Sequence, residues 1–336
     1  MTPSIEAERL VNGFRAFQMV ATACRLQLPD LLAAGPKTAD ELAAQTGTHP
    51  PSLRRMLRGL SAWGVFAETP DGRFVPTVLS DQFRSDRPGF RNDAVMLSED
   101  VYQAWGDLLY TVQTGSPAFE HVFGKRRFEK LADDPEAAAK FNAAMVERSS
   151  RVAAAFIAAY DFDGARIVVD VGGGNGGLLV PVLQAQPGMR GILFDLAQRL
   201  AGAHERMVAA GVADRVTLQE GSFFEAAPSG GNLYMLKNIV HDWDDERSLV
   251  ILRTCRQAMN ATAKIVLLER VMPERIVNAD HALSALMADL QMMVVLGGRE
   301  RSTDEYRNLL EEARLRVTRV IPTDSGYVAI EAEVAG

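Results

Sequence analysis

The residues best suited to acid–base chemistry are a histidine and a glutamate that follow two strands expected to be neighbours. His241 lies in the segment LKNIVHDWDDE, after the apolar run at residues 233–236, and Glu269 ends the apolar run at residues 263–268. An imidazole titrates near neutral pH and can take a proton from a substrate. A carboxylate beside it can hold one tautomer and stabilise the charged form. A lone histidine is more often structural, but this placement favours a catalytic role.

A second chemical feature is the glycine-rich turn IVVDVGGGNGG at residues 167–177. A β-branched run, then glycines, then apolar residues at helical spacing predict a strand, a tight turn and a helix. Glycine lets a backbone turn sharply and come close to a ligand. Gly172, Gly174 and Gly177 have the dinucleotide-binding spacing, and Asp195 after the next strand is placed to accept ribose hydroxyls. Nicotinamide, flavin and S-adenosylmethionine (SAM) all fit this pattern, as does a purely structural turn.

The elements that must position these groups read as an alternation of strands and helices. Strands are expected at residues 167–170, 191–194, 216–219, 233–236 and 263–268, with helical segments between them. This alternation predicts an α/β fold, a Rossmann-like, mainly parallel sheet wound on both faces. Ligands of such sheets bind beyond the carboxyl ends of the strands. The polar residues expected at that edge are Asp195, Ser222, Lys237, His241 and Glu269.

The N-terminal hundred residues predict a different, mostly helical domain. An apolar helical pattern covers residues 5–32, and two shorter helical segments follow at residues 38–45 and 51–63. Asp71 and Gly72 then stand between two short strand-like runs, which is typical of a hairpin. Helix, turn, helix and hairpin together predict a winged helix.

Two roles are open for this winged helix. Arg54, Arg55 and Arg58 on its second helix are compatible with a DNA reader, but the acidic residues of the domain leave no basic excess, so a scaffold is favoured. The first helix carries Phe14 and Phe17, more apolar surface than a solvated arm needs, and predicts a homodimer; packing on its own domain is the alternative.

Length and composition set further bounds. The chain of 336 residues can hold two domains, because single cores rarely exceed about 250 to 300 residues. We expect the winged-helix-like domain at residues 1–100 and the α/β domain at residues 101–336. Residues 101–160 would form a helical linker that also lines a substrate pocket.

Charge and cysteine usage exclude some classes of partner. A net charge of −7 argues against nonspecific nucleic-acid binding, which needs a basic face. The longest apolar stretch, residues 283–296, is interrupted by Asp289 and is too short to cross a bilayer. Cys24 and Cys255 have no metal-binding or disulfide spacing. These observations, with the absence of a signal-peptide pattern, predict a cytoplasmic protein that binds no nucleic acid, membrane or metal.

Six motifs occur in order along the chain. They are VVDVGGGNGG, FDL at 194–196, GSFFE at 221–225, LKNIVHDWDDE at 236–246, LLER at 267–270 and LGGRERS at 296–302. Together they resemble the SAM-dependent O-methyltransferases of small aromatic molecules, and the resemblance covers nearly the whole chain. That family includes plant caffeate and flavonoid enzymes and bacterial enzymes that tailor phenazine and polyketide antibiotics, and it has an N-terminal winged-helix dimerisation domain.

The resemblance implies roles for individual residues. SAM, which leaves as S-adenosylhomocysteine, would be bound by Ser149, Gly172, Gly174, Asp195, Ser222, Phe223 and Lys237. His241 matches the family's general base, and Glu269 and Glu300 match the carboxylates beside it. The family commonly has Asp where this chain has Ser222, and a neutral hydroxyl accepts a hydrogen bond from adenine more weakly than a carboxylate.

The reaction implied is methyl transfer to a phenolic hydroxyl of an aromatic, polycyclic secondary metabolite of the phenazine or polyketide type. Methionine side chains adapt to flat rings, and the expected pocket walls are Met145, Trp243, Met292, Met293 and Leu296. Alternatives within the family are an N-methyltransferase and a non-methylating enzyme. From other classes, an NAD-dependent oxidoreductase would leave the HDW and GGRER segments without a role, and a winged-helix ligand-sensing regulator would require DNA binding.

Overall fold

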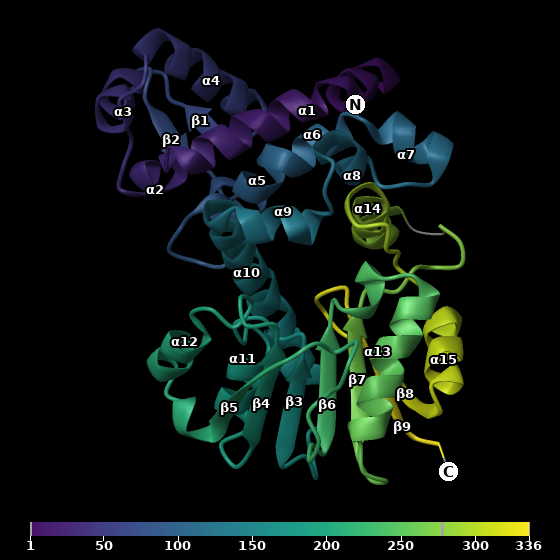
Figure 1. Cartoon of the computed structure of the whole chain (residues 1–336). Coiled ribbons are helices and arrows are strands. Elements are labelled where there is room, and N and C mark those ends of the chain that lie inside the picture. Colours follow the sequence, from purple (N-terminus) through teal and green to yellow (C-terminus); the bar gives the residue numbers. More distant parts are fainter. Residues whose placement is uncertain (1, 277–278, 336) are drawn as a thin grey trace. The chain divides into compact units, whose positions relative to one another are not determined.

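The computed structural model describes residues 2–276 and 279–335 and separates into two compact units (Figure 1). The first unit comprises Met1–Tyr102 and Ala139–Glu147. The second comprises Gln103–Ala138 and Arg148–Gly336. No helix among the described residues is long and apolar enough to span a bilayer.

The first unit contains the predicted winged helix. Its elements are α1 (Pro3–Arg25), α2 (Leu28–Ala33), α3 (Ala39–Thr46), α4 (Pro50–Ala62), the antiparallel hairpin of β1 (Phe66–Glu68) and β2 (Phe74–Pro76), and then η1 (Ser80–Phe83), α5 (Arg91–Met96) and η2 (Leu97–Val101). The single helix expected over residues 5–32 is wrong. Gln27 adopts the left-handed conformation at φ 54°, which ends the first helix and starts a second.

Local capping explains where α3 begins and ends. Thr38 and Glu41 form a reciprocal capping box at the start of α3, and Gly47 ends that helix in the left-handed conformation. The buried apolar side chains of α2, α3, α4 and the hairpin then form one core. The winged helix therefore has a core of its own.

The second unit begins with short helices. They are α6 (Tyr102–Trp105), α7 (Leu108–Thr114), α8 (Ala118–Phe123) and α9 (Arg127–Asp133), followed by the long α10 (Pro135–Ala159), whose residues belong to both units. The helical linker expected over residues 101–160 is divided into separate helices, the first interruption lying at Gly106 and Asp107, because glycine is a poor helix former. In this unit α14 (Ala279–Val295) contacts α7 and α8.

A seven-stranded sheet with the order β5-β4-β3-β6-β7-β9-β8 forms the centre of the second unit (Figure 1). The first five strands in this order are parallel, as predicted, whereas β9 pairs antiparallel with both β7 and β8. The final antiparallel pair was not expected from the sequence. The strands are β3 (Ile167–Val171), β4 (Arg190–Asp195), β5 (Val216–Glu220), β6 (Leu233–Lys237), β7 (Lys264–Glu269), β8 (Leu315–Pro322) and β9 (Val328–Val334).

Both faces of the sheet are covered by helices. Val168 belongs to the core shared with α10, α11 (Leu179–Ala185) and α12 (Ala203–Ala209). Its neighbour Val169 belongs to the core shared with α13 (Asp245–Ala258) and α15 (Thr303–Glu312). Successive strand residues face opposite sides, so a continuous apolar run is needed to fill both cores, as is usual for parallel sheets.

One buried carboxylate joins the antiparallel strands to the rest of this unit. Glu331 on β9 accepts hydrogen bonds from Tyr160 Oη at 2.7 Å, Thr318 Oγ1 at 2.7 Å, Lys264 Nζ at 3.2 Å and the Arg319 guanidinium at 2.6 and 3.0 Å. Burial on its own would raise the pKa of Glu331, but these donors outweigh it and lower the pKa to about 2. The charged form of Glu331 is thus strongly preferred in the folded protein.

We expect Glu331→Gln to lower the free energy of unfolding at pH 7 by on the order of 2 kcal/mol, because four donors lose a buried charged acceptor. Urea denaturation measures this change. The folded-state pKa is depressed, so the contribution is present above the unfolded pKa and is lost as pH falls through about 2. Glu333→Gln on the same strand, where the partner Arg316 is exposed, is the control and should change little. Equal effects of the two substitutions would contradict the prediction.

Candidate active site

Two loops that are distant in the sequence follow adjacent strands at the carboxyl edge of the sheet. The glycine turn follows β3, and the loop with His241 follows β6, which pairs in parallel with β3. From β3 the chain first adds β4 and β5 on one side and then crosses to β6 and β7 on the other. Ligands of open α/β sheets bind at such a change of direction. The topology therefore brings the two predicted chemical features to one place.

The glycine turn is fixed to the end of β4. Gly172 N and Gly173 N both donate to Phe194 O, at 2.8 and 3.3 Å, and Gly174 N donates to Asp195 Oδ2 at 2.9 Å. Gly172 and Gly174 have left-handed φ values of 69° and 57°, which residues other than glycine rarely adopt. A direct hydrogen bond therefore ties Asp195 to the glycine turn.

Gly172 is also a point of close approach. A Cβ atom there would lie 2.5 Å from Ile239 Cδ1 and 3.3 Å from Phe223 Cε1. Phe223 itself packs against Phe224, and both rings lie edge-on to Trp243. The GSFFE segment, the glycine turn and the histidine loop therefore meet at this residue.

A buried acid and a lysine lie beneath the turn. Asp170 is 1% exposed, and its Oδ2 atom has no hydrogen-bond partner among the described residues. Burial raises the pKa of Asp170 to about 7, which the positive charge of Lys237 partly offsets. Burial also lowers the pKa of Lys237 to about 8, against the attraction of Asp170 and Glu269. The two groups therefore stabilise each other's charged forms in a poorly solvated place.

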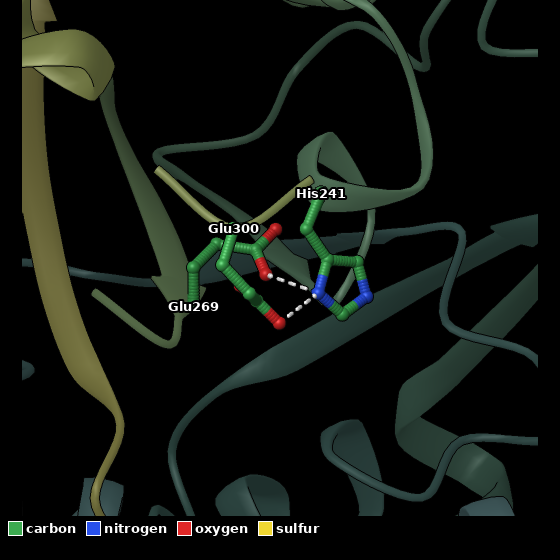
Figure 2. A group of neighbouring side chains, drawn as sticks. All are labelled: His241, Glu269 and Glu300. Carbon is green, nitrogen blue, oxygen red and sulfur yellow. Dashed lines mark hydrogen bonds and ion pairs between the residues drawn. The ribbon is translucent and has the colours of Figure 1, made fainter. Parts of the chain in front are cut away.

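His241 is held by two carboxylates from separate parts of the chain (Figure 2). Its Nδ1 atom lies 2.8 Å from Glu300 Oε1 and 3.7 Å from Glu269 Oε2. All three side chains are buried. The short contact assigns Nδ1 as the donor to Glu300, which leaves Nε2 as the atom that can accept a proton.

The turn that carries His241 also binds Glu269. Ile239 N and Val240 N both donate to Glu269 Oε1 at 3.0 Å. These two consecutive N–H groups follow Asn238, which adopts a left-handed φ of 55°. Asparagine tolerates this conformation better than most residues, and consecutive N–H groups after such a turn form an anion-binding concavity.

The charges of this cluster bias its protonation. Burial on its own would lower the pKa of His241, but Glu269, Glu300 and Asp242 outweigh it and raise the pKa to about 9. Burial, with the negative charges of Glu300 and Asp242, raises the pKa of Glu269 to about 7, although the imidazolium and the Ile239 N–H oppose this shift. The groups therefore titrate as a coupled unit in which the imidazolium is favoured.

The other imidazole nitrogen faces a further acid. His241 Nε2 lies 3.3 Å from Asp242 Oδ1, so the negative charge of Asp242 also favours the imidazolium. One donor atom each from His241, Glu269 and Glu300 also lie within 4.8 Å of one another, a grouping that can hold a cation. The arrangement is thus suited to taking up positive charge, as a proton or as a metal ion.

Comparison with known proteins identifies the architecture. Residues 105–316 match the O-methyltransferase domain, and residues 8–86 match the O-methyltransferase dimerisation domain. The chain belongs to the O-methyltransferase family. A relative at 42% identity, phenazine O-methyltransferase PhzM of Lysobacter antibioticus, aligns over 96% of this chain and 94% of its own. The resemblance inferred from the motifs is therefore confirmed.

Solved structures agree with this assignment. LaPhzM superposes with a TM-score of 0.94 at 40% identity, covering 99% of this chain and 100% of its own. NcsB1 from neocarzinostatin biosynthesis, in complex with SAM and 2-hydroxy-5-methyl naphthoic acid, superposes with a TM-score of 0.80 at 32% identity over 95% of each chain. Two other relatives carry names for different reactions. An 8-amino-8-demethylriboflavin N,N-dimethyltransferase of Streptomyces davaonensis is 34% identical over 94% of this chain and 91% of its own. Aclacinomycin 10-hydroxylase RdmB of Streptomyces purpurascens is 36% identical over 87% of this chain and 79% of its own.

The residues around the glycine turn are compatible with the family's cofactor. Asp195 is buried at the turn, and a Cβ atom on Gly174 would meet no atom within 4 Å, so the turn is open on that side. The unpartnered Oδ2 of Asp170 adds an acceptor suited to an ammonium group. Ser222 Oγ accepts from Phe224 N at 3.3 Å, and Ser149 is buried in α10. The cofactor-binding roles of Ser149 and of the other predicted residues stay predictions.

The predicted substrate-pocket residues fall into three places. Trp243 packs against Phe223 and Phe224, next to the glycine turn. Met292 and Met293 are half-buried near the end of α14, followed by Leu296. Met145 lies in the first unit, half-buried on α10. Their role as pocket walls stays a prediction.

Three residues at the site had no predicted role. Asp170 was read only as the end of a strand, and Asp242 only as a neighbour of the histidine. Asn238 could not be singled out, because a left-handed backbone conformation at a residue other than glycine leaves no distinct pattern in one sequence. The signals available for the first two were an acid within the apolar run that precedes the glycines and an acid next to a candidate base.

Gly298 is required by the contact between its segment and the histidine loop. A Cβ atom there would lie 2.1 Å from His241 O and 2.6 Å from Asp242 C, both backbone atoms that cannot move aside cheaply. We expect Gly298→Ala to displace His241 and lower methyl transfer by roughly 10², the cost typical of a displacement of about 1 Å. Steady-state turnover measures this loss. Gly188→Ala, where a Cβ atom meets open space, should be unaffected, and wild-type turnover in Gly298→Ala would contradict the geometry.

Proposed function

We propose that this protein is a SAM-dependent O-methyltransferase that methylates a phenolic hydroxyl of a planar polycyclic molecule of the phenazine or polyketide type. In this proposal His241 is the general base, and Glu269 and Glu300 stabilise its charged form. The single observation that carries the proposal is the imidazole held at Nδ1 by Glu300, at 2.8 Å, beside the glycine turn at the carboxyl edge of the sheet.

SAM, when bound, supplies a methyl group made electrophilic by its sulfonium. The residues proposed to bind SAM are Ser149, Gly172, Gly174, Asp195, Ser222, Phe223 and Lys237, with Asp170 added from the structure. The protein's own contribution to the chemistry is orientation and proton transfer. A free phenol has a pKa of about 10 and is a poor nucleophile while protonated. His241 Nε2 accepts that proton, and the nearby carboxylates stabilise the resulting imidazolium.

The high pKa of His241 lowers the fraction of the enzyme in which this residue can act as a base at neutral pH. At neutral pH most of the imidazole is already protonated, so only the neutral minority can accept a proton. Proton transfer from a phenol to neutral His241 is nevertheless well matched, because the pKa of a phenol and the pKa of His241 lie close together. The rate should therefore rise with pH until the imidazole is neutral.

The acceptor class is proposed from the relatives and from side-chain type. The names of PhzM and NcsB1 point to phenazine and naphthoate acceptors. Trp243, Met292, Met293 and Leu296, which all lie in the second unit, are the proposed walls, because methionine and aromatic side chains suit flat rings. An N-methylating or hydroxylating activity, as named for two relatives, is the alternative; an already nucleophilic nitrogen needs no base, so the His241 cluster favours an oxygen acceptor.

We further propose a homodimer formed through the first unit. Leu10, Val11 and Phe14 on α1 are 83%, 72% and 50% exposed, which is unusual for a cluster of large apolar side chains. The match of residues 8–86 to the dimerisation domain supports this assignment. Cytoplasmic location and the absence of nucleic-acid and membrane partners stay predictions from charge and composition.

His241→Ala should lower methylation of a hydroxylated phenazine or naphthoate by roughly 10² or more, because the general base is lost. SAM affinity, measured by calorimetry, should stay near wild type. Mass spectrometry for one added methyl group measures the reaction. A chelator present throughout tests whether the reaction needs a metal ion bound by His241, Glu269 and Glu300. His204→Ala, on an exposed residue of α12, is the control. Full turnover in His241→Ala removes the base assignment, and loss of wild-type turnover in chelator favours a bound cation.

The pH dependence of kcat/KM should show an acidic limb governed by His241, rising through about pH 9. Glu300→Gln removes a negative charge that favours the imidazolium, so the pKa of His241 falls and the limb should move to lower pH by about one unit. The maximal rate should also fall, because the charged base is less well stabilised. Glu312→Gln, an exposed residue paired with Arg253, is the control. A limb that stays in place or moves to higher pH contradicts the assignment.

A further inference from the structure

Arg301 is a fully buried cation directly beside the proposed catalytic glutamate. By volume it is the largest of the fully buried side chains among the described residues. Burying a guanidinium costs several kcal/mol unless its N–H groups are paired. The hydrogen-bond partners of the Arg301 guanidinium therefore determine how this residue, next to Glu300 in the chain, can be buried.

The Arg301 guanidinium donates hydrogen bonds to backbone carbonyl oxygens on both sides of His241. Arg301 Nη1 donates to Val240 O at 3.0 Å, and Nη2 donates to Trp243 O at 2.8 Å. Nε and Nη2 both donate to Asp245 Oδ1, at 3.0 and 2.7 Å. The carbonyl oxygens belong to the turn η4 (Val240–Asp242) and the residue that follows it. One side chain thus spans the segment from before the histidine to the first residue of α13.

The backbone of the same segment is anchored from the other side. Arg299 N donates to His241 O at 2.9 Å, and Met272 N donates to Arg301 O at 2.9 Å. Arg301 also forms a parallel bridge with Val271, two residues after Glu269. The segment that supplies Glu300 is therefore tied both to the histidine loop and to the end of β7.

We infer that Arg301 is a positioning residue for His241: its guanidinium fixes the loop so that Nδ1 stays within hydrogen-bond distance of Glu300. This inference rests on the proposed role of His241 as the base. The planar fork of arginine can reach two carbonyl oxygens and a carboxylate at once, whereas the single ammonium of lysine cannot. Arg301 touches no reacting atom in this scheme, and its effect passes through the imidazole.

Arg301→Lys tests the inference. We expect a folded protein by circular dichroism, with SAM affinity and KM for the acceptor within about threefold of wild type. The turnover number kcat should fall by roughly 10-fold to 10²-fold, as for a displaced catalytic group. The acidic limb of kcat/KM should move to lower pH, because the contact between His241 and Glu300 that favours the imidazolium is weakened. A purely structural role would lower thermal stability and leave the pH limb in place.

Arg299→Gln is the matched control. Arg299 also pairs with Asp245, at 3.0 Å, and with Glu305, but its guanidinium is half exposed and binds no carbonyl oxygen of the loop in the described contacts. Its kcat and pH limb should match wild type. Wild-type kcat and an unmoved limb in Arg301→Lys, or the same change in Arg299→Gln, overturn the inference.

A second variant covers failure of Arg301→Lys to fold. Asp245→Asn removes the carboxylate partner of Arg301 and should produce a smaller change of kcat and pH limb in the same direction. An unchanged kcat and limb in Asp245→Asn would then count against the inference. Failure of the proposed function is separate: it appears as full turnover in His241→Ala, whereas failure of this inference alone leaves His241→Ala inactive and Arg301→Lys normal.

Discussion

The buried pairing of His241 with Glu269 and Glu300 is the constraint on which the carboxyl edge of the sheet depends. A buried carboxylate without a cation or donors is costly, so each of these acids needs a fixed partner. Glu269 obtains two N–H donors from the turn at Asn238, and Glu300 obtains the imidazole. The turn, the end of β7 and the segment at Gly298 therefore have to fit together, and the loop that carries the base follows from that fit.

The sheet makes this arrangement economical in sequence. Parallel strands end at one edge, so residues from β3, β4, β6 and β7 converge without long connections. The side of the edge near β4 carries the glycine turn and Asp195, which suit a ribose, and the side near β7 carries the acids that favour an imidazolium. Ile239 and Phe223 meet at Gly172, between these two sides. The proposed cofactor site and the proposed base therefore meet at a few residues.

Much of the fold and part of the site could be predicted from the sequence. The five parallel strands follow from apolar runs that must fill two cores, and the winged helix follows from helical spacing and the Asp71–Gly72 turn. The helix break at Gln27 and the antiparallel strands β8 and β9 were missed, because neither a left-handed glutamine nor the choice of a sheet edge is specified by local pattern. The pocket walls stay predictions, since apolar residues on α14 read alike as core and as pocket.

The sequence by itself determined which groups are available and at which strand ends they lie: the glycines after β3, Asp195 after β4, His241 after β6 and Glu269 at the end of β7. Those placements follow from periodicity and from the common direction of parallel strands. Only the tertiary structure decided that Glu300, from a segment about 60 residues beyond the histidine, makes the closest contact with Nδ1, and that Arg301 holds the carbonyl oxygens on either side. These are contacts between remote segments, and their geometry depends on packing and on burial of charge, which no local pattern encodes.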